Sequence, residues 1–254
     1  MIVSAQCELY YSTLTDLEVE SASTASDWLS EDELVLWHKF RATVRRDTFL
    51  AGRILAKRLL RAQHCAASQA VPSQITIRSD ASSSGVRPRI MLGGHRLAYS
   101  LSISHTSDAV LVGGTNRFGI SIGVDLVQMR ALGAAFERSW FTEAESTCLR
   151  ENEGEMTVAD IWAMKEAVFK AVHRGESFAP RSVEIHLKPE GMTVFYHGRN
   201  LGDRCHLRVW RLGDEVAAVA TYQRLGARSQ RNSELRDSQF TTSNLIPCSL
   251  RLIP

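Results

Sequence analysis

The stretch D-I-W-A-M-K-E-A-V-F-K-A-V-H, residues 160–173, reads as a helix with two different faces. On one face apolar side chains recur at the spacing that a core-facing helix requires, and Asp160 can cap its start. The other face gathers an acid, two amines and two aromatic rings, for which packing alone gives no reason. The apolar stripe is Ile161, Met164, Val168, Ala171 and Val172, and the other face is Trp162, Lys165, Glu166, Phe169, Lys170 and His173.

Taken alone, that polar face is also explained by structure. Glu166 and Lys170 stand at positions i and i+4, where a weak surface ion pair can form. Elsewhere in the chain, however, a second acid, Asp125, lies near the end of the strand-like run 120–127, and Ser104 with His105 ends another such run. Apolar residues alternate along 120–127, so Asp125 points away from them, into solvent or a cleft.

The composition is that of an ordinary globular protein. The chain has 254 residues, 44% hydrophobic and 23% charged, enough for one large domain or two small ones with a packed core. The net charge of +2 indicates no polyanionic partner, although residues 37–64 carry eight Lys or Arg against one acid and can attract phosphate or an acidic protein surface.

Cysteine usage and hydropathy suggest where the protein resides. The five cysteines are scattered without C-x-x-C spacing, which favours neither a disulfide framework nor a zinc site. The sequence shows neither a secretory leader pattern nor an apolar run of membrane-spanning length. We therefore expect a cytoplasmic protein without a membrane partner.

Helices and strands are interspersed without the regular alternation of a parallel sheet, which favours an α+β fold. Capping patterns predict helices after Ser30 and after Thr142, and periodicity predicts a longer helix over residues 45–64. Residues 226–254 turn polar, and we interpret them as a tail without assigned chemistry. Strands are expected at 2–11, 74–78, 97–104, 109–113, 120–127, 183–187, 192–196, 206–210 and 216–222.

Asp125 and Glu166 together suit magnesium, which takes one or two protein carboxylates and completes its octahedron with water and substrate phosphates. Lysines beside such a site can neutralise a pyrophosphate, and phosphoryl transfer needs mainly positioning, charge neutralisation and a base. The chain has neither G-x-x-x-x-G-K nor G-x-G-x-x-G, so side chains and strand ends would have to hold the phosphates.

Several short motifs, in this order and spacing, resemble the 4′-phosphopantetheinyl transferase superfamily. The length is similar to that of the larger, surfactin-synthetase-activating type, which implies a monomer of two similar halves, here residues 1–118 and 119–225. The resemblance extends from about Lys39 to Lys170 and more loosely to about Tyr222. The motifs are F-L-A-G-R (49–53), G-V-R-P (85–88), S-I-S-H (102–105), G-V-D (123–125), F-T-E-A-E (141–145) and W-A-M-K-E-A-V-F-K (162–170).

The resemblance implies transfer of the phosphopantetheine arm of coenzyme A to a serine of an acyl or peptidyl carrier protein, with release of adenosine 3′,5′-bisphosphate. Asp125 and Glu166 would hold Mg²⁺ on the pyrophosphate, and Glu166, directly or through water, would be the base. Lys165 and Lys170 would lie near phosphate oxygens, and Ser104 with His105 would contact the coenzyme A phosphates. Arg87 would lie near the adenosine end, with Arg78 a further candidate and Arg53 serving either the ligand or helix packing.

One position departs from the family pattern. Many members carry a second acid two residues after the motif aspartate, where this chain has Val127. The departure leaves a non-catalytic module that binds carrier proteins or coenzyme A as the alternative. A nucleic-acid-binding role for residues 37–64 is a poorer hypothesis, because no aromatic platform or reader motif accompanies the basic residues.

Overall fold

A computed structural model of the chain describes residues 7–17, 22–79, 87–129, 132–152, 154–173, 175–188, 191–224 and 248–253. Helices and strands are mixed along the chain, and every described strand pairing except one is antiparallel. The predicted α+β class is therefore confirmed.

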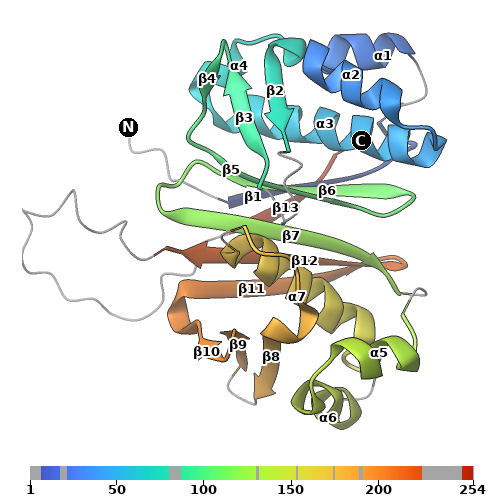
Figure 1. Cartoon of the computed structure of the whole chain (residues 1–254), viewed down its shortest axis with the longest axis vertical. Coiled ribbons are helices and arrows are strands. Elements are labelled where there is room, and N and C mark those ends of the chain that lie inside the picture. Colours follow the sequence, from blue (N-terminus) through green and yellow to red (C-terminus); the bar gives the residue numbers. More distant parts are fainter. Residues whose placement is uncertain are drawn as a thin grey trace, which may run out of the picture.

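The first half of the chain begins with a strand, continues through four helices to a small sheet, and closes with a hairpin (Figure 1). The two closing strands join the first strand in a sheet of order β1-β6-β5. The helices are α1 (Ala22–Trp28), α2 (Glu31–Lys39), α3 (Thr43–Gln63) and α4 (Cys65–Ser68); the strands are β1 (Cys7–Thr13), β2 (Ile75–Arg78), β3 (Arg89–Leu92), β4 (His95–Arg96), β5 (Ser100–His105) and β6 (Ala109–Thr115).

The second half repeats this order of elements. Its sheet, β7-β12-β11, again places the first strand beside the last, as the prediction of two similar halves requires. The boundary that we propose between residues 118 and 119 lies in the turn between β6 and β7. The helices are α5 (Ala134–Trp140), α6 (Glu143–Glu151) and α7 (Val158–Val172); the strands are β7 (Ile120–Gln128), β8 (Val183–Lys188), β9 (Gly191–Tyr196), β10 (Arg199–Asn200), β11 (Cys205–Leu212) and β12 (Glu215–Gln223).

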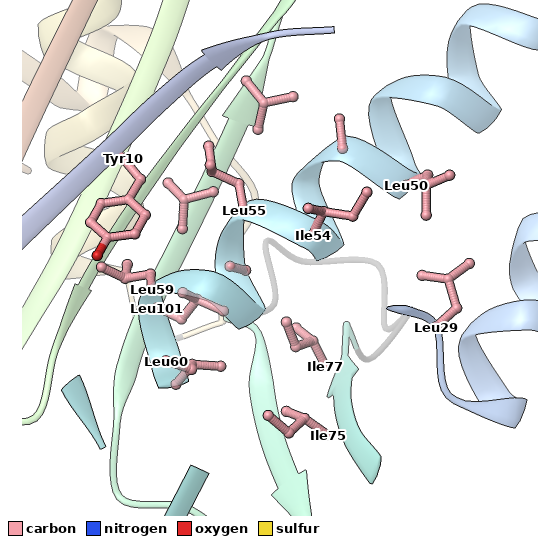
Figure 2. Packing of buried hydrophobic residues seen from close by; sticks show 14 of the residues in the cluster. Tyr10, Leu29, Leu50, Ile54, Leu55, Leu59, Leu60, Ile75, Ile77 and Leu101 are labelled. Carbon is pink, nitrogen blue, oxygen red and sulfur yellow. The ribbon is translucent and has the colours of Figure 1, made fainter. Parts of the chain in front are cut away.

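In the first half the long helix α3 forms the centre of the core. Figure 2 shows Leu50, Ile54 and Leu59 of α3 between the β1-β6-β5 sheet and the small β2-β3-β4 sheet. These three side chains are fully or almost fully buried. The predicted apolar stripe of this helix is thus the face that joins the two sheets.

The helix α7 takes the corresponding place in the second half, against β7 and β12. Its predicted apolar stripe is buried, and it begins slightly earlier than predicted. Thr157, not Asp160, is the N-cap, because Asp160 at the third helical position accepts a hydrogen bond from the Thr157 amide at 2.7 Å.

At Gly123 of β7 the helix approaches the strand closely. A Cβ atom there would lie 2.1 Å from the Ala167 carbonyl oxygen and 2.5 Å from the Ala171 nitrogen. Only glycine therefore allows α7 to lie this close to the strand that carries Asp125.

Serine side chains join the two halves. Three alternate amides of β7, those of Ile122, Val124 and Leu126, donate hydrogen bonds of 3.0–3.2 Å to serine hydroxyls of β5. The acceptors are Ser100, Ser102 and Ser104, in the same order. This side-chain ladder satisfies the edge amides of one sheet with the edge strand of the other and fixes the register between the halves.

The end of the chain differs from the predicted polar tail. Residues Cys248–Leu252 form strand β13, which pairs in parallel with β1. The intervening residues 225–247 lie outside the described part of the chain. Within the described residues, helices long and apolar enough to cross a membrane are absent.

Candidate active site

A cleft of about 580 Å³ lies between the two halves. Its walls come from α3, from β5 and from α7, so each half supplies one long helix and the serine ladder runs beside it. A second opening of about 480 Å³ continues from it along β7 and shares His105, Glu166 and Lys170 with it. The helix face that combined charged and aromatic residues in the sequence thus borders this cleft.

Three predicted residues meet where the two openings join. Asp125 is 3% exposed and accepts hydrogen bonds from the Ser104 hydroxyl at 2.8 Å and from the Lys170 ammonium at 2.6 Å. Lys170 Nζ also lies 3.4 Å from Glu166 Oε2. One amine therefore stands between two carboxylates that are far apart in the sequence.

The charges of this cluster perturb one another. Burial, and then the charge of Asp125, raises the pKa of Glu166 to about 7, although Lys170 acts in the opposite direction. Burial alone would lower the pKa of Lys170, but the two carboxylates outweigh burial and raise it. A carboxyl group that titrates near neutral pH can take up a proton and release it again during a reaction cycle.

His105 lies at the end of β5 on the rim of the same cleft. Its Nε2 is 2.8 Å from Arg45 Nη1 of α3. Burial, and then the charge of Arg45, lowers the pKa of His105. Arg45 was not singled out in the sequence; the only signal for it was its place in the basic segment 37–64.

Arg87 joins the two halves instead of projecting freely into the cleft. Its Nη2 donates to the carbonyl oxygen of Ala171 and, at 2.9 Å, to that of His173, so it caps the end of α7 from the other half. Burial lowers the pKa of Arg87 to about 10. The Gly85 and Val86 part of its motif lies outside the described residues.

Two predicted ligands of the phosphates lie elsewhere. Lys165 is fully buried and donates to Glu145 at 2.5 Å, so its expected place near phosphate oxygens is corrected to a buried ion pair behind the cleft. Arg78 is 58% exposed at its side chain, pairs with Asp32 and does not line the cleft. Arg53 does line the cleft, but its guanidinium lies 2.9 Å from Glu33 and over the ring of Phe49.

The residues present fit a magnesium ion only in part. Asp125 and Glu166 provide two oxygen ligands, which suffices for an ion that retains several waters. Val127 lines the second opening, but its side chain has no oxygen that could bind a metal. Within the described part of the chain, no group of three or more His, Cys, Asp or Glu side chains could hold a metal ion. Lys170 supplies the positive charge between the two carboxylates in this structure.

The chain is similar to a solved structure and to a protein-family model. The acyl carrier protein synthase of Mycobacterium tuberculosis is a similar solved structure, 27% identical, with a TM-score of 0.30; the match covers 40% of this chain and 95% of that one. No curated protein matches the chain. The family model described as the 4′-phosphopantetheinyl transferase superfamily matches residues 121–220, which supports a phosphopantetheinyl transferase activity in general. This match covers the residues that hold Asp125, Glu166 and Lys170.

Proposed function

We propose that the protein transfers the 4′-phosphopantetheine arm of coenzyme A to a serine hydroxyl of an acyl or peptidyl carrier protein, in a magnesium-dependent reaction. The observation that carries the proposal is the meeting of Asp125, Lys170 and Glu166 in a cleft whose family match lies in the same residues. One chain supplies both walls of the cleft, so we propose that it acts as a monomer.

In this proposal Glu166 accepts the proton of the carrier serine, directly or through a water. The serine oxygen forms a bond to the pantetheine-side phosphorus, and the bond from that phosphorus to the bridging oxygen breaks, so that adenosine 3′,5′-bisphosphate leaves with the electron pair. Lys170 stabilises the negative charge of the phosphate oxygens, and Ser104 holds Asp125 in place. Asp125 and Glu166 would hold Mg²⁺, which neutralises the pyrophosphate charge when it is bound.

His105 and Arg45 occupy the rim where the phosphates of coenzyme A would enter. Their side chains meet at 2.8 Å and come from two neighbouring elements of the first half, β5 and α3. Both can donate to phosphate oxygens, and a guanidinium does so with two parallel hydrogen bonds. We propose that this pair, rather than Lys165 or Arg78, holds the ligand phosphates.

The test is the mass of apo carrier proteins after incubation with the protein, coenzyme A and Mg²⁺. A panel that spans fatty-acid, polyketide and nonribosomal-peptide carriers should include at least one that gains the mass of the arm. Glu166→Gln should abolish the gain while it preserves the fold, and Glu143→Gln, an exposed glutamate on α6, is the matched control. A panel left unmodified by the parent protein would remove the proposal.

The alternative, a module that binds carriers or coenzyme A without turnover, is favoured by one observation. Val127 has no carboxylate, so only Asp125 and Glu166 provide acidic side chains to the second opening. Under this alternative, coenzyme A binds and no carrier gains mass. The same assay, combined with a binding measurement, therefore separates the two functions.

A further inference from the structure

A second cleft, of about 450 Å³, lies at the other end of the junction between the halves. It is lined by the first residues of β5 and β7, whereas His105 and Asp125 lie further along the same strands. Arg87, Pro88 and Leu101 line both clefts, so they form the wall between them. We call this second cavity the arginine cleft, after Arg87, Arg96, Arg117 and Arg224 in its lining.

The charged side chains that line the arginine cleft are all positive. None of its described lining residues is an acid. Arg96, Arg117 and Arg224 are exposed, and no ion pair joins them to a carboxylate in the part of the chain that the structure describes. The charge of Arg224 adds to burial in lowering the pKa of Arg87, while the charge of Glu176, which does not line the cleft, raises it. Such a set of cations, converging on one cavity, favours an anion.

An aromatic ring stands at the edge of this cleft. Phe118 lies in the turn between β6 and β7, and 86% of its surface is exposed although it is large and apolar. The next residue, Gly119, has a φ of 77°, a backbone conformation that allows the tight turn and presents the Phe118 ring outward. An exposed ring beside guanidinium groups suits a ligand with a planar ring and a phosphate chain, because guanidinium forks match phosphate oxygens and the aromatic face stacks on a base.

We propose that the arginine cleft binds a nucleoside diphosphate, with its phosphates on Arg96 and Arg117 and its base on Phe118. The site goes beyond the proposed transfer reaction, because none of these three residues lines the cleft of Glu166 and Lys170. Arg87 is the exception that lines both, since it forms the wall and caps α7.

The test measures the binding of ADP, used as the probe, to the full-length chain by isothermal titration calorimetry. The double variant Arg96→Ala/Arg117→Ala should weaken ADP binding at this site by about tenfold or more, the size expected when about 1.4 kcal/mol of phosphate contacts is lost. The control is Arg199→Ala/Arg208→Ala, which removes two exposed arginines of β10 and β11 that line neither cleft. Equal binding by the two double variants would overturn the proposal.

A second variant separates the base from the phosphates. Phe118→Ala should weaken the binding of ADP but leave that of inorganic pyrophosphate unchanged. Equal weakening of both, or of neither, would overturn the assignment of the base to Phe118.

A third double variant distinguishes ADP binding in the arginine cleft from ADP binding at the proposed transfer site. Arg45→Ala/His105→Ala removes two residues of the first cleft and should leave the ADP binding that depends on Arg96 and Arg117 intact. If this pair eliminated all ADP binding, the arginine cleft would not be a site. If only the Arg96→Ala/Arg117→Ala variant weakened ADP binding, the arginine cleft would be supported as a site, and the proposal that Arg45 and His105 bind phosphates in the first cleft would be contradicted.

Discussion

Each half of the molecule buries one glutamate in the same surroundings, yet only one half places carboxylates in the cleft. Glu33 of α2 accepts from the amides of Ser30 and Ile77, both at 3.0 Å, and pairs with Lys57 of α3 at 2.5 Å. Glu145 of α6 repeats the pattern with the amides of Thr142 at 2.9 Å and Ile185 at 3.0 Å and with Lys165 of α7 at 2.5 Å.

The halves differ at the residue after the buried lysine. In α7 this residue is Glu166, which lines the cleft; in α3 it is Arg58, whose guanidinium lies over Trp28 at 5.5 Å. The first half instead gives the cleft cations, Arg45 and Arg53. The shared buried pair therefore orients each long helix, and the chemistry depends on what the cleft face of that helix carries.

The largest effect on stability should come from breaking the two buried pairs. Glu33→Ala and Glu145→Ala each leave a buried lysine without its partner, which destabilises a protein by about 3–5 kcal/mol. Glu33→Ala should be the more severe, since Arg53 also loses its partner. Urea unfolding measures both, against Glu31→Ala and Glu143→Ala, which remove exposed glutamates of the same two helices. Losses no greater than those of the controls would show that the pairs do not anchor the helices.

A smaller effect should distinguish the contacts between helix and strand in the two halves. Gly123→Ala places a methyl group against the α7 backbone, and overpacking of this kind costs about 1–3 kcal/mol. Gly52→Ala in α3 meets only the side-chain methyl of Ile103, at 3.2 Å, which can move. We expect Gly123→Ala to lower both the free energy of unfolding and the transfer rate more than Gly52→Ala. The reverse order would show that the close approach of α7 to β7 is not needed.

The smallest effect concerns the histidines that end the two long helices, His64 after α3 and His173 after α7. Burial, and then the charge of Arg87, lowers the pKa of His173 to about 4, so the unfolded chain takes up this proton first as pH falls. The free energy of unfolding should therefore decrease between about pH 6.5 and about pH 4, and His173→Gln should remove part of that decrease. Unfolding at several pH values measures it, with His64→Gln as the control; identical slopes for His173→Gln and the parent would contradict the buried, neutral imidazole.

Periodicity and capping were enough to predict the long helices and most strands. The apolar stripes of α3 and α7 and the capping boxes at Ser30 and Thr142 are local patterns, and local patterns determine such elements. Strand β13 was missed because its partner, β1, lies at the other end of the chain.

The candidate site was predicted only in part. The periodicity of the helix placed Lys165 on the same face as Glu166, because periodicity shows which way a side chain points but not which residue it contacts. Glu145, which neutralises the buried Lys165 amine, is 20 residues away in the sequence. Likewise, the motif put Arg87 near the ligand, whereas the fold uses its guanidinium to hold the end of α7. Roles that depend on contacts between separate elements of the chain are not encoded in the spacing along one helix.

The most direct test of the account counts the Mn²⁺ ions that the protein binds when coenzyme A is present, by electron paramagnetic resonance. Mn²⁺ serves as the probe because it prefers the same oxygen ligands as Mg²⁺. The account predicts one bound ion in the parent, weaker binding by about tenfold or more in Asp125→Asn and Glu166→Gln, and unchanged binding in Arg58→Gln, the corresponding position of the other half. Equal Mn²⁺ binding by all four proteins, or none by the parent, would contradict the claim that these two carboxylates share one ion.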